Sequence, residues 1–564
     1  MTGKPNARSL IGELKRRHVF KVGATYAVVA FVVIQAAEVM ADALSLPTWT
    51  LPFITVLAIL GFPLAIVLAW AFDLTEQGVR RDVEDTVASD TPDHDEAIVR
   101  PRVVSDRSVA VLPFANLSGE KENEYFSDGI TEDIITGLSR MRDLHIISRT
   151  SVMRYKGSTA TVREIAEELG VATVLEGSVR RADGRVRISA QLIDARQDRH
   201  LWVETYDHRF EDVFSIQSEV AREIAQALAA ELSPEEKERI GARPTVDVEA
   251  YDLFLKGRYL WNRRTEAGLD KSIGYYRRSL ERDPNFALAE AGLADSYVTL
   301  GLYGHEAPHE VMPRARDAAT HALALDSRLA EALTSLATVR SIYDWDWQEA
   351  ERDYRRAIDM HPQYPVSHHW LAANLLTPLG RFEEAQVSTI RALELDPLSA
   401  PVATSLGMIC LYSGRCGVAL EELSQVVDLH DRFGLAFYFQ GLAFEEQGRM
   451  DDAIETLEKA DALTGGSSEV QASLGHACAK AGDLGRARSI LESLERRFEE
   501  HYGSPALLAQ VHLGLGDEER ALDLLEKAAE MRAVDMIWLG VRPVYRPLAD
   551  NGRFRALLDL VGVS

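Results

Sequence analysis

The chain opens with two long apolar runs. They cover residues 22–41 (VGATYAVVAFVVIQAAEVMA) and residues 50–72 (TLPFITVLAILGFPLAIVLAWAF). Each run has about the ~20 residues that a helix needs to cross the hydrocarbon core of a bilayer. Only a few residues around Ser45–Pro47 connect the runs. The pattern therefore predicts a transmembrane helical hairpin over residues 22–73.

Basic residues predict the orientation of this hairpin. They precede the first run and follow the second, and the connector carries none. Because cytoplasmic flanks are rich in Lys and Arg, we expect residues 1–21 to be a basic cytoplasmic N-terminus that meets anionic lipid headgroups. A cleaved signal peptide is the alternative, but the second apolar run follows at once. The basic residues are Lys4, Arg8, Lys15, Arg16, Arg17 and Lys21 before the hairpin, and Arg80 and Arg81 after it.

Two polar residues lie inside the first run. Gln35 and Glu38 are either an intramembrane functional site or, for Glu38 with Asp42, groups near the outer interface, where polar side chains cost little. The second interpretation is favoured. Residues 74–106 are rich in Asp and Glu and lack apolar periodicity, which predicts an acidic flexible linker.

Residues 107–235 alternate between strand and helix patterns. Residues 108–119 (SVAVLPFANLSG) are typical of a buried strand that ends in a turn, and residues 125–141 carry apolar positions at helical spacing. Asp183 and Gly184 predict a type I′ hairpin turn, since both positions of that turn need positive φ. We expect a small two-layer α+β domain. The apolar positions of the strand after the turn, which predict one covered sheet face, are Val186, Ile188, Ala190 and Leu192.

The same segment resembles a known family. The string SVAVLPFANLSGEKENEYFSDGITEDIITGL, followed by ISRTS, LEGSVRR and HLWVETYD, is similar to the TolB amino-terminal-like (FlgO-like) domain of bacterial multidomain proteins. In that family the domain precedes tetratricopeptide repeats. The architecture is often fused to, or labelled as, adenylate cyclase. Here the exchangeable amino-terminal part is the predicted membrane hairpin. The resemblance implies association with other proteins and brings no catalytic residues.

A period of 34 residues runs through the second half of the chain. It is the period of tetratricopeptide repeats, in which two antiparallel helices form one unit. The glycines of one column, each 34 residues apart, are Gly380, Gly414, Gly448, Gly482 and Gly516. Columns of alanine, of small residues and of leucine have the same step; they include Ala453, Gly407, Gly441 and Leu423. We expect about eight repeats over residues 247–533 and a C-terminal cap over residues 534–564.

Charge and cysteine content exclude several classes of function. A net charge of −25 opposes bulk attraction to nucleic acid, which depends on Lys and Arg. Cys410, Cys416 and Cys478 form neither a disulfide framework nor a zinc motif and are expected as core residues in a reducing compartment. The chain has no Walker, HExxH or GxSxG motif and no glycine-rich dinucleotide turn. We therefore predict no enzyme activity, no cofactor and no metal site.

Polar clusters in the repeats have a functional and a structural interpretation. His361, His368 and His369 are either metal ligands or structural and surface histidines, and no Cys or second His pair accompanies them. Asp344 and Asp346 of the DWDW string are either paired carboxylates or part of a loop turn with two packing tryptophans. The structural interpretation is favoured for both clusters.

Acidic residues of the α+β domain pose the same choice. Glu124, Asp128, Glu132 and Asp133 are either the lining of a nucleotide or metal pocket or residues near a helix start. In the favoured interpretation Asp128 caps the helix and the others complement its dipole.

The repeats also predict where a partner protein binds. The inner helix of each repeat lines a concave surface, so side chains beside the small-residue column can meet a ligand. Around Gly407 and Gly441 these side chains form a partly apolar set that suits hydrophobic anchors, although several of them are equally explained as core. The set is Thr404, Met408, Tyr438 and Leu442.

Together these patterns predict a multidomain chain: two transmembrane helices, a small α+β domain and an all-α tetratricopeptide superhelix. The predicted function is a membrane-anchored scaffold at the inner (plasma) membrane, with both ends cytoplasmic, that binds partner proteins in signalling or assembly. The alternatives are a signalling enzyme or regulator of the nucleotide cyclase-associated type, and a ligand sensor that acts through the α+β domain. The sequence leaves the partner and the oligomeric state open.

Overall fold

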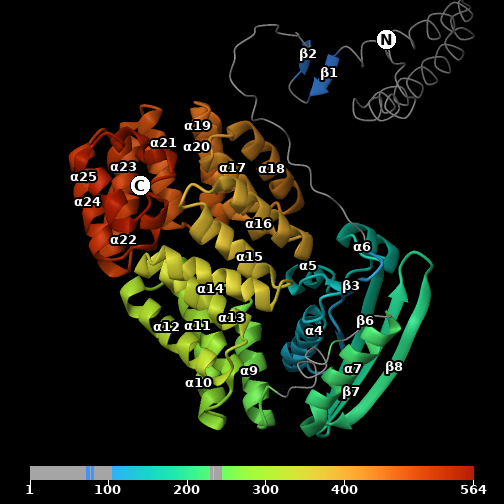
Figure 1. The fold of residues 1–564 in the computed structure, drawn as a ribbon. Coiled ribbons are helices and arrows are strands. Elements are labelled where there is room, and N and C mark those ends of the chain that lie inside the picture. Colours follow the sequence, from blue (N-terminus) through green and yellow to red (C-terminus); the bar gives the residue numbers. More distant parts are fainter. Residues whose placement is uncertain (1–71, 76–77, 82–104, 229–232, 234–243) are drawn as a thin grey trace, which may run out of the picture. The chain divides into compact units, whose positions relative to one another are not determined.

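The computed structural model describes residues 72–75, 78–81, 105–228, 233 and 244–564 (Figure 1). Its contacts divide the chain into two units, Met1–Asp93 and His94–Ser564. The predicted membrane helices, with Gln35 and Glu38, lie outside the described residues apart from Phe72. Within the described residues, none of the helices combines the length and the apolar character that crossing a bilayer requires.

The described part of the first unit is a short hairpin. Strand β1 (Phe72–Thr75) pairs antiparallel with β2 (Gly78–Arg81), with Phe72 opposite Arg81. The hairpin begins at the last residue of the second apolar run and continues into the segment predicted as a flexible linker.

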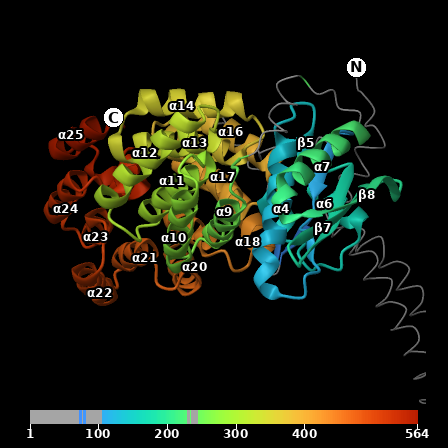
Figure 2. The ribbon, with the colours of Figure 1, turned by 90° about the horizontal axis from the view of Figure 1, so that it is seen from below.

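The second unit begins with a mixed sheet of strand order β5-β3-β6-β7-β8, in which β4 also pairs with β6. Strand β3 is parallel to β5 and β6, and β4 is parallel to β6, whereas β7 is antiparallel to both β6 and β8. Helices α4 and α7 lie side by side against the sheet (Figure 1, Figure 2). The strands are β3 (Ser108–Val111), β4 (Ala115–Asn116), β5 (His145–Ile146), β6 (Thr173–Ala182), β7 (Arg185–Asp194) and β8 (Arg199–Arg209), and the helices are α4 (Glu124–Ser139), α5 (Arg149–Met153), α6 (Val162–Leu169) and α7 (Val213–Ala227).

Local sequence explains most of these elements. Asp183 and Gly184 both have positive φ, 52° and 71°, so the predicted hairpin turn between β6 and β7 is confirmed. The four apolar positions predicted to alternate along β7 are all buried. Strand β8 is not predicted by its pattern. Leu201, Trp202 and Val203 are consecutive apolar residues without alternation, and Val203 is exposed at the edge of the sheet.

The rest of the chain consists of helix pairs. In the described residues after 244 there are eight successive antiparallel pairs, from α9–α10 to α23–α24 (Figure 1). Short π-helical turns, η3 (Arg340–Asp344) and η4 (Ala372–Leu376), extend α13 and α15. The pairs are α9 (Val248–Trp261) with α10 (Glu266–Arg282), α11 (Ala287–Leu302) with α12 (Pro308–Leu325), α13 (Ala330–Val339) with α14 (Trp347–Met360), α15 (Pro365–Leu371) with α16 (Phe382–Leu395), α17 (Ala400–Tyr412) with α18 (Cys416–Leu429), α19 (Gly434–Glu446) with α20 (Met450–Thr464), α21 (Ser468–Lys480) with α22 (Leu484–Glu500), and α23 (Pro505–Gly514) with α24 (Glu518–Glu530).

The glycine column marks the turn inside each pair. Its five glycines have φ between 68° and 90°, a left-handed conformation that glycine adopts without steric cost. Gly304 has the same role in the second pair. In the first and third pairs the left-handed residues are Arg264 (φ 54°) and Trp345 (φ 60°). The first and third pairs therefore keep the left-handed turn although they lack the turn glycine.

The small-residue column allows the two helices of a pair to approach closely. A Cβ added to Gly407 would lie 2.5 Å from Leu423 Cγ, and one added to Gly441 would lie 2.7 Å from Leu457 Cγ. Each leucine belongs to the second helix of the same pair. The small-residue and leucine columns therefore pack against each other inside the pairs.

The chain ends with η5 (Val534–Trp538), η6 (Pro543–Leu548) and α25 (Gly552–Val561). One continuous hydrophobic core contains side chains of the sheet, of the first repeat pairs and of this C-terminal segment. Cys410 and Cys478 are buried, as predicted, and Cys416 is half-buried.

Replacing Ala453 by Phe tests the repeat register. Ala453 is fully buried in α20, and a bulky ring there must push the two helices of the pair apart. We expect the free energy of unfolding to fall by about 1–3 kcal/mol in urea titrations followed by circular dichroism. Glu455→Phe, at an exposed position of the same helix, is the control and should change it little. Equal midpoints for the two variants would contradict the register.

Candidate functional site: a groove between the α+β domain and the first repeats

A largely buried ion-pair cluster joins α4 to α9, the first repeat helix. The Arg258 guanidinium contacts Asp133 Oδ1 at 2.6 Å through Nη2 and Glu132 Oε2 at 3.2 Å through Nε. Arg149 Nε of α5 lies 3.2 Å from the same Glu132 oxygen, and the Tyr251 hydroxyl donates to Asp133. Burial opposes the charge of Arg258, but the two carboxylates hold its pKa above the ordinary value. The carboxylates of the α+β domain thus neutralise the arginine of the first repeat helix.

A second polar cluster lies nearer the start of α9. Asp252 accepts hydrogen bonds from Arg181 Nη1 (2.6 Å), the Tyr125 hydroxyl (2.7 Å) and Lys256 Nζ (2.8 Å). Arg181 comes from β6 and Tyr125 from α4, so the contact reaches the sheet as well as the helix.

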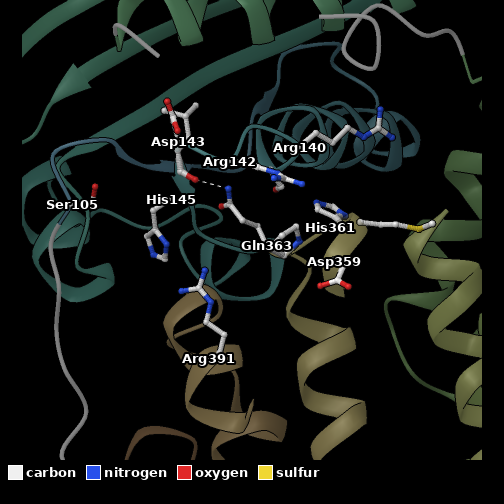
Figure 3. Close-up of a pocket in the computed structure, with 13 residues that line it drawn as sticks. Ser105, Arg140, Arg142, Asp143, His145, Asp359, His361, Gln363 and Arg391 are labelled. Atoms are coloured by element: carbon white, nitrogen blue, oxygen red, sulfur yellow. Dashed lines mark hydrogen bonds between the residues drawn. The ribbon is translucent and has the colours of Figure 1, made fainter. Parts of the chain in front are cut away.

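The loop before α15 forms a third contact, which we call the Gln363 clasp. Gln363 Nε2 donates to the carbonyls of Met141 (2.7 Å) and Leu144 (2.5 Å), and its Oε1 accepts from the Ile146 N–H (3.0 Å). The dashed line at Gln363 in Figure 3 is the bond to the Leu144 carbonyl. One side chain therefore satisfies three backbone groups of the loop that leads into β5. Buried backbone groups are costly when unpaired, so the clasp fixes the distance between the domain and the repeats.

These contacts roof a groove of about 750 Å³. Its floor comes from the first helix of four successive pairs and its roof from α4, α5 and α7. Because inner helices of stacked pairs line the binding surface of a repeat array, this is the candidate functional site. Floor residues include Tyr251, Phe254, Arg258, Trp261, Leu288, Ala291, Asp295, Glu331, Tyr364 and Val366, and roof residues include Glu132, Asp133, Arg149, Phe214 and Ser218.

Arg264 is the most distinctive side chain of the groove. It lies 3.6 Å from the Trp261 ring centroid and donates from Nη1 to the Thr299 hydroxyl at 3.0 Å. A non-glycine residue held at positive φ stores backbone strain, which is often found at functional positions. Burial raises the pKa of Asp295 to about 7, and burial together with Arg264 lowers the pKa of His369 to about 4. The groove therefore offers a stacked cation beside a carboxyl group that titrates near neutrality.

The predicted partner-binding stripe is not part of this groove. Thr404, Met408 and Tyr438 are buried, and Leu442 is half-buried against the core of the middle repeats. Thr404, Met408 and Tyr438 therefore fit the alternative interpretation, in which these positions are core residues.

The chain's own C-terminal segment contributes to the burial of Tyr438. Arg542 donates to the Tyr438 hydroxyl and lies 3.1 Å from Glu469 Oε1, and Trp538 and Val541 pack on the same core. The inner surface of the later repeats is thus occupied by the segment predicted only as an end cap.

The acidic residues of α4 are ion-pair partners rather than helix-start residues. The prediction that Asp128 caps the helix is wrong, because it is buried inside α4 and its carboxylate lies 2.6 Å from Lys156 Nζ. Asn123 holds the N-cap position. Glu132 and Asp133 lie further along the helix, where they bind Arg258 and Arg149. Of the four acids only Glu124 lies in the first turn, where it also pairs with Lys156.

The DWDW string has the structural role that was favoured. Asp344 pairs with Arg316, and Asp346 caps α14. Both tryptophans pack on the C-terminal segment: Trp345 stacks with Arg532 at 3.9 Å, and Trp347 Nε1 donates to the Val561 carbonyl at 2.8 Å.

The histidine cluster is dispersed among different partners. His368 Nε2 contacts the Pro362 carbonyl at 3.0 Å, His369 Nε2 contacts the Ser405 hydroxyl at 2.8 Å, and His361 stacks on Tyr364. Over the described ranges, no group of three or more His, Cys, Asp or Glu side chains has a geometry that would hold a metal ion.

The groove residues were missed because the 34-residue columns fade in the first repeats. Arg264 and Trp345 replace the turn glycine there. One signal was available: Phe254 and Arg258 lie three before and one after Gly257, the spacing used for the predicted stripe, and both line the groove. Gly257 packs against Tyr276, as small-column residues do.

Two family descriptions match the chain. The second domain of HilA/YgeH-like transcriptional regulators matches residues 105–226, which include the sheet, and the tetratricopeptide repeat matches residues 405–468. The first match does not test the resemblance to TolB amino-terminal-like domains, which stays a prediction. The second confirms the tetratricopeptide repeats.

Curated relatives cover parts of the chain. A "putative adenylate cyclase 3" of Rhizobium meliloti (strain 1021) is 47% identical over 194 residues, 34% of this chain and 33% of that protein. "Superkiller protein 3" of Schizosaccharomyces pombe is 27% identical over 273 residues, 45% of this chain and 19% of that protein. The chain therefore spans a third or less of these relatives' lengths.

Among solved structures, YrrB, described as a tetratricopeptide protein with an unusual peptide-binding site, is 21% identical. The match covers 33% of this chain and 91% of that one, with a TM-score of 0.24. With the tetratricopeptide match and the eight helix pairs, the chain contains a repeat scaffold of the kind that binds other proteins.

Replacing Arg258 by Ala tests the cluster that holds the groove together. The change leaves Glu132 and Asp133 partly buried without their main cation, and breaking a buried pair costs about 3–5 kcal/mol. Because these side chains are 15–19% exposed and Arg149 still contacts Glu132, we expect a smaller fall in the free energy of unfolding, about 1–3 kcal/mol, in denaturant titrations. Arg314→Ala, an exposed arginine of α12, is the control and should stay within about 0.5 kcal/mol. If both variants unfold at the parent's midpoint, the cluster does not hold the groove.

Proposed function

We propose that the chain is a membrane-anchored scaffold whose groove between the α+β domain and the first four repeat pairs binds a segment of a partner protein. The observation that carries the proposal is the contrast between the two parts of the repeat array. Around Tyr438 the inner surface is filled by the chain's own Arg542 and Trp538, whereas beside Arg264 it bounds a cavity of about 750 Å³.

The groove suits a short extended or helical segment. Its volume of about 750 Å³ lies within the range of ~300–1,000 Å³ that small-molecule pockets occupy, so it holds the anchoring side chains of such a segment. Trp261 of α9, which is half-buried, supplies apolar contact area, Arg264 supplies a positive charge, and Asp295, whose pKa burial raises to about 7, supplies a carboxyl group. A partner segment that presents an apolar anchor beside a charged residue matches this lining.

Membrane anchoring is supported by the sequence of residues 22–73. The two apolar runs have the length of membrane spans, and the Lys and Arg bias favours cytoplasmic ends. A scaffold tethered in this way would gather its partner at the inner membrane, in signalling or assembly.

A second candidate is a signalling role of the nucleotide cyclase-associated type. It is favoured by the relative described as a putative adenylate cyclase. The present chain has apolar runs and an acidic segment in the place where that family carries a cyclase domain, so we propose a regulatory rather than a catalytic part in such signalling.

Site-specific photo-crosslinking tests the scaffold proposal. A benzophenone amino acid replaces Trp261 in the groove, and irradiation is carried out in cells that make the full-length chain. We expect one defined protein adduct, which sediments with the membrane fraction.

Two further positions serve as matched controls. Val387 is exposed on α16, and Val203 is exposed on β8 of the α+β domain; neither lines the groove. Both should give no adduct of that mass. An adduct at Val203 and none at Trp261 would assign binding to the α+β domain, and cyclase activity in the purified full-length chain would contradict the non-catalytic role that both candidates assume.

A further inference from the structure

Residues 534–548, which we call the covering segment, lie on the inner surface of the later repeats. The helices beneath them are α17, α19, α21 and α23, the first helices of four successive pairs, and such helices line the binding surface of a repeat array. Tyr438 lies three before Gly441, and Gln510 lies one after Ala509, which is the spacing that faces this surface. Both side chains are buried. A surface of the kind that binds partners is thus covered by the chain itself.

The contact is centred on one arginine. Arg542, whose side chain is 3% exposed, donates to the Tyr438 hydroxyl and lies 3.1 Å from Glu469 Oε1, and Tyr412 lies beside the same guanidinium. Burial opposes the charge of Arg542, but the two tyrosines and Glu469 hold its pKa above the ordinary value. We call Tyr412, Tyr438 and Glu469 the arginine pocket. Arginine seated among tyrosines is a common anchor where one protein binds another.

Side chains, rather than the backbone, hold the covering segment in place. Its backbone hydrogen bonds in the described part of the chain are local, as from the Val541 N–H to the Trp538 carbonyl, and none joins it to α17, α19, α21 or α23. Trp538 and Val541 pack on the core of the middle repeats, and the Tyr545 hydroxyl donates to the Ala506 carbonyl at 3.4 Å. A bound peptide is held in the same way, and its release breaks no backbone hydrogen bond of the helices.

The polar pairing of the contact is incomplete. Trp538 Nε1 is buried and has no hydrogen-bond partner among the residues that the structure describes. The Glu469 side chain is 39% exposed, so water reaches the pocket. An unpaired buried donor costs free energy, and a buried ion pair is often no more stabilising than apolar packing of the same volume. These features suit the recognition of one side chain better than a permanent cover.

We propose that the covering segment is an internal ligand, which a partner protein displaces by placing an arginine of its own in the arginine pocket. The partner segment carries an aromatic anchor four residues before that arginine, as Trp538 precedes Arg542. The covering segment is tethered and therefore competes at a high effective concentration. The second unit thus has an open groove at its first repeats and a closed site at its later repeats.

Fluorescence anisotropy with the purified full-length chain tests this site. The probe is a labelled synthetic peptide with the sequence of residues 534–548 (VDMIWLGVRPVYRPL). We expect the Arg542→Ala chain to bind the peptide at least tenfold more tightly than the parent does, because its own segment no longer fills the pocket. The same peptide with alanine in place of its first arginine should bind that chain at least tenfold more weakly.

Further variants assign the binding to the pocket. Glu469→Gln, added to the Arg542→Ala chain, should weaken peptide binding at least tenfold. Arg546→Ala is the matched control: this arginine of the covering segment is exposed and pairs with Glu446, so the variant should bind the peptide no better than the parent. Trp538→Ala is a second opening variant and should also bind more tightly. Thermal melts followed by circular dichroism show which variants are folded.

Several outcomes would overturn the proposal. Equal binding by the parent and the opening variants would place the peptide elsewhere on the surface, and no binding to a folded opening variant would show that the segment is not a ligand. If neither opening variant folds, the segment is a permanent part of the core. A dimer of the parent, seen by light scattering and lost in the Arg542→Ala chain, would make a second copy the occupant. The groove is tested separately, since crosslinking at Trp261 does not involve this segment.

Discussion

The buried charge of Arg258 is the constraint on which the rest of the second unit depends. A guanidinium group inside a protein is tolerated only beside carboxylates, and here both carboxylates belong to a different part of the chain. The surface that covers α9 must therefore provide carboxylates for Arg258. The face of α4 that carries Glu132 and Asp133 does so, and the α+β domain caps the first repeat.

The groove follows from this cap. Repeat arrays need their terminal apolar faces covered, and the two ends of this array are covered differently. At the start, the α+β domain rests on α9 and on the Gln363 loop and leaves space above the inner helices. At the other end, the segment after α24 folds back and places Arg542 against Tyr438. Both ends of the array are covered. The α+β domain leaves a cavity at the first end, whereas the C-terminal segment fills the inner surface at the other.

Much of the fold could be predicted from sequence because it is local and periodic. The left-handed turn of each pair selects glycine, close helix approach selects small residues, and the Asp183–Gly184 turn fixes the hairpin of β6 and β7. Contacts between distant segments left no such pattern. Arg542 and Tyr438 are 104 positions apart, and Arg258 and Asp133 are 125 apart. Without those contacts, the sequence leaves Tyr438 open as either a partner-binding or a core position and favours Asp128 as a helix cap.

The central claim is that the α+β domain forms one folded body with the repeats and roofs the groove. Hydrogen–deuterium exchange tests it most directly, by comparing the full-length chain with a fragment that begins at Val246. The account predicts that amides of α9 are protected in the full-length chain as strongly as those of α11. In the fragment α9 should exchange rapidly, while α17–α21 keep their protection. Equal protection of α9 in both samples would show that the repeats fold without the α+β domain and would contradict the account.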